Sequence, residues 1–352
     1  EVVVRRKWLT EDRFLDLVGA TNLIPGPNST ELAIHIGWER RRWAGLVVAG
    51  AAFIFPAMLI TGALGWAYVR FGSVPTAAWL LYGVKPVILG VVAQAIYGLA
   101  PKAARTMPLR LLAGLAILLA ALGVNELIVL FGAGALAVGY SQGAGRSKPG
   151  RGKTLLLSPL LLPAAAPMIG ASTATLSGLF WVFLKIGSVL FGSGYVLLAF
   201  LRADLVQRLH WLTEAQLVDA VAVGQVTPGP VFTTATFIGY VVAGPKGAIV
   251  ATTGIFLPAF AFVGLSGPLI PKIRSSPFAG AFLDGVNVGS LALMAVVTVQ
   301  LGRAAVVDVP SALFAIVAAA LLVRFKPNAT WLILGGAAAG WLAHSCGIAV
   351  AR

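Results

Sequence analysis

Two lysines of this 352-residue chain lie inside long apolar segments, where a charged side chain is energetically unfavourable. Lys85 lies within 77–100, directly before Pro86, and Lys185 lies within 176–200. A lysine at membrane depth costs several kcal/mol unless it is paired or faces water. Two such charges favour the binding of an anion. The alternative is that either side chain extends to the nearer membrane surface, which is easier for Lys185 than for Lys85.

The motif Pro-Gly-Pro occurs twice, at 25–27 and at 228–230. A helix cannot run through it, because each proline lacks an N–H and clashes with the preceding turn. The helix that starts after the motif presents N–H groups and the positive end of its dipole, an arrangement that binds anions. The alternative is an ordinary turn at a membrane surface. Two copies favour a buried tip that binds an anion.

Residues that donate hydrogen bonds, or let the backbone come close, complete the predicted site. The glycine-rich stretch 191–195 permits either helix packing, the simpler interpretation, or a further tip. The predicted substrate-binding residues are Pro25, Gly26, Pro27, Asn28, Ser29, Thr30, Lys85, Lys185, Gly192, Ser193, Gly194, Gln225, Pro228, Gly229, Pro230, Thr233 and Asn287, with Thr234 as a further donor. Glu31 and Asp284 are the candidates for a coupling acid, and Asp284 could equally pair with a lysine or lie near the surface.

The sequence lacks the residues that a disulfide framework, a metal site or an enzyme active site would need. The single cysteine, Cys346, excludes a disulfide framework and a cysteine-based metal site. His35, His210 and His344 stand far apart in the sequence, so a zinc site has no ligand set. We therefore predict no catalytic residues, no metal, no cofactor and no enzyme activity.

The composition excludes a water-soluble body. Apolar residues make up 59% of the chain and charged residues only 11%, whereas soluble proteins carry about 25% charged residues. The net charge of +14 fits basic cytoplasmic loops. We therefore predict that the protein contacts membrane lipid and does not bind nucleic acid. The predicted spanning segments are 44–69, 77–100, 176–200, 247–269, 278–301, 312–323 and 330–349, with a hairpin of two short helices over 108–140.

The chain contains an internal duplication. Trp8-Leu9-Thr10-Glu11 recurs at 211–214, Asp16 recurs as Asp219, and the two Pro-Gly-Pro motifs occupy matching positions. After a gap of one residue the spacing falls from 203 to 202 residues, which makes Asn287 the partner of Lys85. We predict a first repeat at 1–140, a basic linker with a proline-rich piece at 141–172, and a second repeat at 173–352. A helix matching 176–200 would precede residue 1, so we expect the first repeat to lack one span.

Basic residues give the expected orientation. If 155–171 does not cross the membrane, most lysines and arginines fall on the cytoplasmic side, together with the 40–42 arginine run and the linker. The two repeats then cross in opposite directions, which is typical of transporters. If 155–171 does cross, the repeats are parallel. The predicted fold is an all-α polytopic membrane protein with two inverted-topology repeats, each with a Pro-Gly-Pro-broken re-entrant helical hairpin.

The order K-W-L-T-E, P-G-P, I-G, F-x-x-P-A and a second P-G-P copy resembles the chromate ion transporter family, in a two-domain form, over essentially the whole chain. One departure is FGSG at 191–194, where the family pattern is FGGG. The resemblance implies export of chromate across the bacterial inner membrane, driven by the proton motive force. Sulfate has the same shape and charge, so a sulfate-like oxyanion is the alternative substrate and an anion channel the alternative class. The oligomeric state is open, and a homodimer is one alternative.

Overall fold

The computed structural model describes residues 2–21, 23–72, 75–144, 174–191, 194–266, 276–325 and 327–346. All regular structure within these ranges is helical. Five helices are long and apolar enough to cross a bilayer. The prediction of an all-helical polytopic membrane protein is therefore confirmed. The linker beyond residue 144 and the proline-rich piece 155–171 lie outside the described residues.

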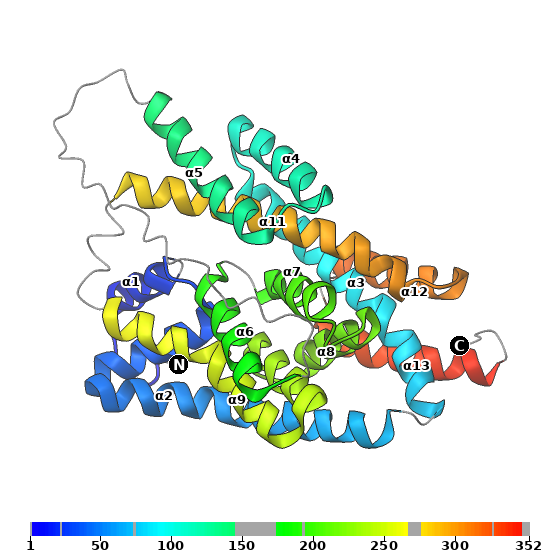
Figure 1. The fold of residues 1–352 in the computed structure, drawn as a ribbon. Helices are drawn as coiled ribbons and strands as arrows, with labels where there is room; N and C mark the ends of the chain where they lie inside the picture. The colour runs from blue at the N-terminus through cyan, green and yellow to red at the C-terminus, as the bar shows by residue number, and fades with distance from the viewer. Residues whose placement is uncertain are drawn as a thin grey trace.

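The helices carry the labels of Figure 1. In chain order they are α1 (Glu11–Thr21), α2 (Asn28–Phe71), α3 (Pro75–Ala103), α4 (Met107–Ala121), α5 (Glu126–Ala144), α6 (Leu176–Val189), η1 (Gly194–Val196), α7 (Leu197–Leu201), η2 (Arg202–Arg208), α8 (Glu214–Val226), η3 (Val231–Thr233), α9 (Thr234–Ser266), α11 (Pro277–Ala305), α12 (Val309–Phe325) and α13 (Ala329–Ser345). The predicted hairpin at 108–140 is the pair α4 and α5.

The duplication extends to the helix boundaries. α3 begins at Pro75 and α11 at Pro277, which is 202 residues later, and α4 and α12 begin at Met107 and Val309 with the same spacing. The two copies therefore contain the same series of elements from α1 to α5 and from α8 to α13. The directions in which they cross the membrane, and the domain boundaries at 140 and 172, stay predictions.

α2 and α9 each contain a reversal of the chain. The backbone leaves helical geometry at Arg41 and Arg42 in α2. A Cβ added to Gly37 would lie 2.2 Å from the carbonyl oxygen of Gly45, eight residues later. A straight helix would separate these residues by about 12 Å, so the two parts of α2 pack against each other as a tight hairpin. A helix begins directly after the first Pro-Gly-Pro, and its first part ends at this turn.

The second copy has the same reversal at Ala243 and Gly244. There Gly239 and Gly247 repeat the contact: a Cβ on Gly239 would lie 2.3 Å from the carbonyl oxygen of Gly247. Small residues allow this approach of two helix backbones, as they do in other membrane helix pairs. Each copy therefore runs through a short helix, Pro-Gly-Pro, a half-helix, a reversal and a long helix.

The two copies are packed into each other. α3 packs against α12 and α13, whereas α11 packs against α4 and α5, so each long helix contacts the last two helices of the other copy. α2 and α9 also lie side by side, away from α4, α5 and α11 (Figure 1). α8 lies between these groups and contacts α2, α3, α9, α11 and α13. The largest buried apolar cluster is centred on α6 to α9.

The predicted continuous span 176–200 is wrong. α6 ends at Val189, Leu190 and Phe191 are not helical, and the chain resumes as η1 at Gly194. Leu190 has an extended backbone, and its carbonyl accepts a hydrogen bond from Gly26 instead of continuing a helix. The glycine-rich stretch therefore accompanies a helix break, and the interpretation as simple helix packing is corrected. Gly192 and Ser193 lie outside the described residues.

Candidate functional site

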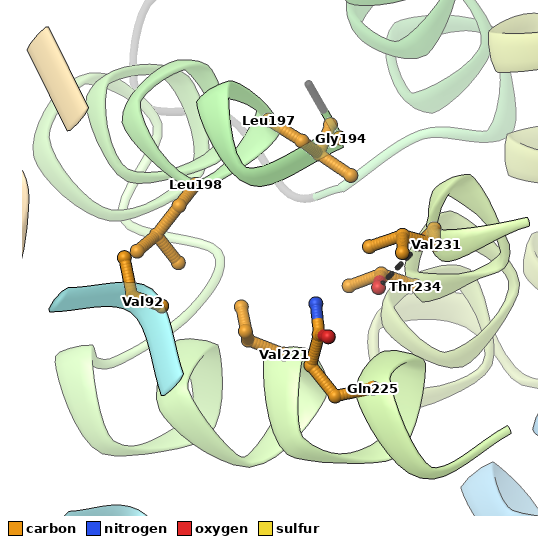
Figure 2. Close-up of a pocket in the computed structure, with 8 residues that line it drawn as sticks. All are labelled: Val92, Gly194, Leu197, Leu198, Val221, Gln225, Val231 and Thr234. Carbon is orange, nitrogen blue, oxygen red and sulfur yellow. Dashed lines mark hydrogen bonds between the residues drawn. The ribbon is translucent and has the colours of Figure 1, made fainter. Parts of the chain in front are cut away.

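A small pocket lies where two breaks in the chain meet (Figure 2). Gly194, Leu197 and Leu198 follow the break after α6, and α8 contributes Val221 and Gln225. The remaining lining residues are Val231 and Thr234, just after the second Pro-Gly-Pro, and Val92 of α3. We call this the Gln225 pocket. It has room for about one water molecule, so an oxyanion requires it to widen.

The local sequence explains why α8 ends beside this pocket. Thr213 caps the start of α8 in a capping box with Gln216, which satisfies otherwise unpaired N–H groups. Gly229 has φ of 132°, a conformation that glycine adopts readily. Pro230 is extended and leads into η3, and its carbonyl accepts a hydrogen bond from the backbone N–H of Thr233. The second Pro-Gly-Pro therefore breaks the helix as predicted.

Gln225 supplies a polar group to the pocket that has no hydrogen-bond partner among the described residues. This group, the amide nitrogen, points toward the middle of the pocket in Figure 2. The hydroxyl of Thr234 donates to the carbonyl of Val231 at 2.7 Å, and that of Thr233 donates to the carbonyl of Pro230 at 2.8 Å. A buried amide N–H without a partner is costly, and an anion oxygen would satisfy it.

Lys85 is held by a carboxylate that the sequence interpretation did not select. Its Nζ lies 3.3 Å from Oδ1 of Asp219 on α8, and the hydroxyl of Tyr68 on α2 donates to Oδ2 of Asp219 at 2.9 Å. Lys85 and Val92 are seven residues apart on α3 and thus share a helix face. Lys85 therefore lies about 10 Å along α3 from the Gln225 pocket.

Lys185 is also paired. Its Nζ donates to Oδ1 of Asp204 at 2.7 Å, and Nε of Arg208 donates to the same oxygen at 3.0 Å. Asp204 is buried in the π-helical turn η2. Two cations thus share one carboxylate, and the positive charge of Lys185 is committed to this cluster.

The first Pro-Gly-Pro is covered more completely than the second. Pro25 to Pro27 are buried, and the N–H of Gly26 donates to the carbonyl of Leu190 at 2.8 Å. Pro228 and Gly229 are exposed, and a Cβ on Gly229 would meet Ala57 of α2. The first motif is covered by Leu190 and Glu31, which lie over Gly26, whereas in the second motif only Pro230 is buried. The prediction of a buried second tip stays a prediction.

The half-helix after the first Pro-Gly-Pro begins at Asn28. The carbonyl of Pro27 accepts hydrogen bonds from the N–H groups of Thr30 and Glu31. Asn28 is partly buried, Ser29 is exposed and Thr30 is buried. The Thr30 hydroxyl has no partner among the described residues, so it remains available to a ligand at this end of the helix.

Glu31 is a fully buried acid. Neither of its carboxyl oxygens has a hydrogen-bond partner within the described ranges, and a Cβ on Gly26 would lie 2.2 Å from Oε1 of Glu31. His35, one helical turn further along α2, is also buried, and its Nε2 likewise lacks a partner there. A buried charge without a partner is unfavourable, so the carboxyl of Glu31 is suited to hold a proton in this arrangement.

Two predicted residues lie elsewhere. Asp284 of α11 is partly exposed and bonds to Nη2 of Arg105 at 2.7 Å, and Asn287 is exposed. The structure thus brings Gly194, Gln225 and the residues after Pro230 to one pocket, with Lys85 along α3. It does not bring Asn287 or Asp284 to the Gln225 pocket.

Asp219, Tyr68 and Asp204 were missed by the sequence interpretation. Asp219 carried a signal, because it matches Asp16 in the duplication. Among the described residues no group of three or more His, Cys, Asp or Glu side chains is placed to hold a metal ion.

Comparison with known sequences decides the family. The sequence model described as "Chromate transporter" matches residues 1–139 and 177–341. This chain belongs to the chromate transporter family. No solved structure matches it.

Curated relatives agree with this assignment. A protein named "Chromate transport protein" from Cupriavidus metallidurans is 36% identical over 96% of this chain and 84% of its own length. Another of that name from Pseudomonas aeruginosa is 31% identical over 97% and 85%. A "Probable chromate transport protein" from Synechococcus elongatus is 31% identical over 90% and 81%. The chain is accordingly a multi-pass membrane transport protein and not an enzyme.

Proposed function

We propose that this protein exports chromate from the cytoplasm by secondary active transport across the bacterial inner membrane. The observation that carries the proposal is the Gln225 pocket, where the break after α6 meets the second Pro-Gly-Pro and an unpartnered amide N–H points inward. The names of the relatives support chromate as the substrate. Lys85, on the same face of α3 as the pocket, supplies positive charge for a dianion.

The membrane potential favours this direction. Moving one charge across 100 mV is worth about 2.3 kcal/mol, so a dianion leaving a negative interior gains about 4.6 kcal/mol per 100 mV. The inverted arrangement of the two copies and their re-entrant Pro-Gly-Pro hairpins remain part of the proposal. The reciprocal packing of α3 and α11 supports a related pair of halves that move against each other.

Among the two candidates for a coupling acid, Glu31 has the better position. It is buried beside Gly26 at the first Pro-Gly-Pro, whereas Asp284 is partly exposed and bound to Arg105. Glu31 is therefore the residue that we propose binds and releases the proton that drives secondary transport. A sulfate-like oxyanion is the alternative substrate, because it offers the same shape and charge to the same donors.

Proteoliposomes test the proposal. The purified chain is reconstituted with chromate on both sides, the membrane potential is clamped to zero, and a pH gradient is imposed. We expect chromate to move against its own gradient, and we expect this movement to stop when the pH gradient is collapsed. Chromate flux only down its gradient would indicate an anion channel, and transport of sulfate without chromate would reassign the substrate. A homodimer is tested in parallel by the mass of the detergent-solubilised particle.

A further inference from the structure

The ion pair of Lys85 and Asp219 places a carboxylate where the proposed substrate would bind. Lys85 Nζ lies 3.3 Å from Asp219 Oδ1, so the ammonium group is already neutralised in this structure. A carboxylate and an incoming dianion would compete for the same donors. Binding of an oxyanion to Lys85 therefore requires Asp219 to release the ammonium group.

We propose that Asp219 is an internal stand-in for the transported oxyanion. It neutralises Lys85 while the path is empty, and an oxyanion that reaches the ammonium group displaces it. Tyr68 then holds the displaced carboxylate through the hydrogen bond to Oδ2, which is already present at 2.9 Å. The inference rests on the proposed function, in which Lys85 binds the oxyanion, and adds two residues to that site.

The two partly buried lysines differ in the way that displacement requires. Charge-assisted N–H···O bonds are usually about 2.7–2.9 Å long, and Lys185 meets Asp204 at 2.7 Å. Asp204 is also bound by Arg208, so two cations hold it. Asp219 has one lysine at the longer distance of 3.3 Å and a neutral phenol. The Lys85 pair is thus the exchangeable one, and the Lys185 cluster is a fixed one.

Exposure of the two partners points the same way. The side chain of Lys85 is 21% exposed and that of Asp219 only 3%. The side chain of Lys85 is therefore partly accessible, while Asp219 is enclosed. Lys85 shares a face of α3 with Val92, a lining residue of the Gln225 pocket.

Displacement of Asp219 from Lys85 would also break a contact between α8 and α3. Asp219 lies on α8, which lines the pocket with Val221 and Gln225 and ends directly before the second Pro-Gly-Pro. The ion pair is a charged link between α8 and α3. Substrate at Lys85 removes this link, so occupation of the site loosens α8, the helix that leads into the break at 228–230.

Equilibrium binding of radiolabelled chromate to the purified full-length chain tests the stand-in role. In Asp219→Asn the side chain keeps its size and loses its charge, so Lys85 is free and we expect binding about 10-fold tighter or more. Lys85→Ala should lose binding, and Lys85→Ala/Asp219→Asn should bind as weakly as Lys85→Ala. The control Glu39→Gln, which removes an acid paired with Arg13 outside the proposed site, should bind as the wild type does.

A purely structural ion pair gives other results. Asp219→Asn would then bind chromate with unchanged or lower affinity, and the inference would be overturned. If Asp219→Asn does not fold, Tyr68→Phe decides, because loss of the hydrogen bond makes displacement harder. We expect this variant to bind chromate several-fold more weakly, and unchanged affinity overturns the inference. A wild type that binds neither chromate nor sulfate contradicts the proposed function, and the inference falls with it.

Discussion

Charged side chains inside the helix bundle differ in how firmly they are held. Lys185 shares Asp204 with Arg208, while Lys85 pairs with Asp219 alone among the residues that the structure describes. Glu31 has no hydrogen-bond partner in the described part of the chain. Breaking a buried pair by removing one partner is strongly destabilising, so the effect of a substitution depends on what it leaves behind. Function at these positions has to be separated from stability.

Lys85→Ala is expected to reduce both transport and stability. The oxyanion loses a charged hydrogen-bond partner worth about 1.5–3 kcal/mol, which corresponds to about 10- to 150-fold in affinity. The buried Asp219 also loses its cation, at a cost of about 3–5 kcal/mol in the free energy of unfolding. Initial rates of chromate export from vesicles, measured together with thermal unfolding in detergent, check the two effects.

Two further variants separate these effects. Lys85→Ala/Asp219→Asn removes both charges, so stability should return toward the wild-type value while export stays low. Lys85→Arg keeps the charge in another shape and hydration state and should retain part of the export. Wild-type export by a well-folded double variant would mean that Lys85 has no part in binding the anion.

The sequence was informative about single residues and uninformative about their partners. Lysines in apolar segments are rare enough to be noticed without a structure. Their partners were not predictable, because 134 residues separate Lys85 from Asp219 and no local pattern records that contact. Tyr68 and Asp204 belong to no motif, and their contacts with Asp219 and Lys185 become visible only in the folded chain. Asp284, selected for its position in sequence, pairs with Arg105 instead.

At the scale of elements, glycine and proline decide where the helices turn. Pro-Gly-Pro predicted both breaks correctly, since no helix can pass through it. The break after α6 was the second of two interpretations, because a glycine-rich stretch is compatible with helix packing as well as with a bend. The tight reversals in α2 and α9 depend on glycine pairs eight residues apart. The match of Gly37 and Gly45 to Gly239 and Gly247 was visible in the duplication, but their contact was not.

Gly239→Ala is expected to destabilise the hairpin in α9. The new methyl group would lie 2.3 Å from the backbone carbonyl of Gly247, and backbone cannot move aside without separating the two helical parts. Overpacking of this kind costs about 1–3 kcal/mol. The control is Gly98→Ala in α3, where an added Cβ meets nothing within 4 Å and alanine favours the helix. Thermal unfolding should rank Gly98→Ala at or above the wild type and Gly239→Ala below it; the reverse order would contradict the hairpin.

At the scale of the whole molecule, the two copies form one body. α3 lies on α12 and α13, and α11 lies on α4 and α5, so each copy completes the packing of the other. Gly83 approaches the backbone of Gly336 in α13, and its counterpart Gly285 approaches that of Ala133 in α5. Such reciprocal contacts are expected of two related halves around a shared site. Composition and duplication predicted a helical membrane protein with two related halves. That α3 and α11 each pack against helices of the other copy could be seen only in the structure.

The orientation of the two copies is the remaining prediction at this scale. The reversals at 41–42 and 243–244 occupy matching positions, so inverted repeats place them on opposite sides of the membrane, with the arginine-rich turn in the cytoplasm. After replacement of Cys346, the single cysteine of the chain, Arg41→Cys should react with an impermeant maleimide only in inside-out vesicles. Lys246→Cys should react only in intact cells. Labelling of both from the same side would mean that 155–171 crosses the membrane, that the repeats are parallel, and that the two Pro-Gly-Pro hairpins enter from one face.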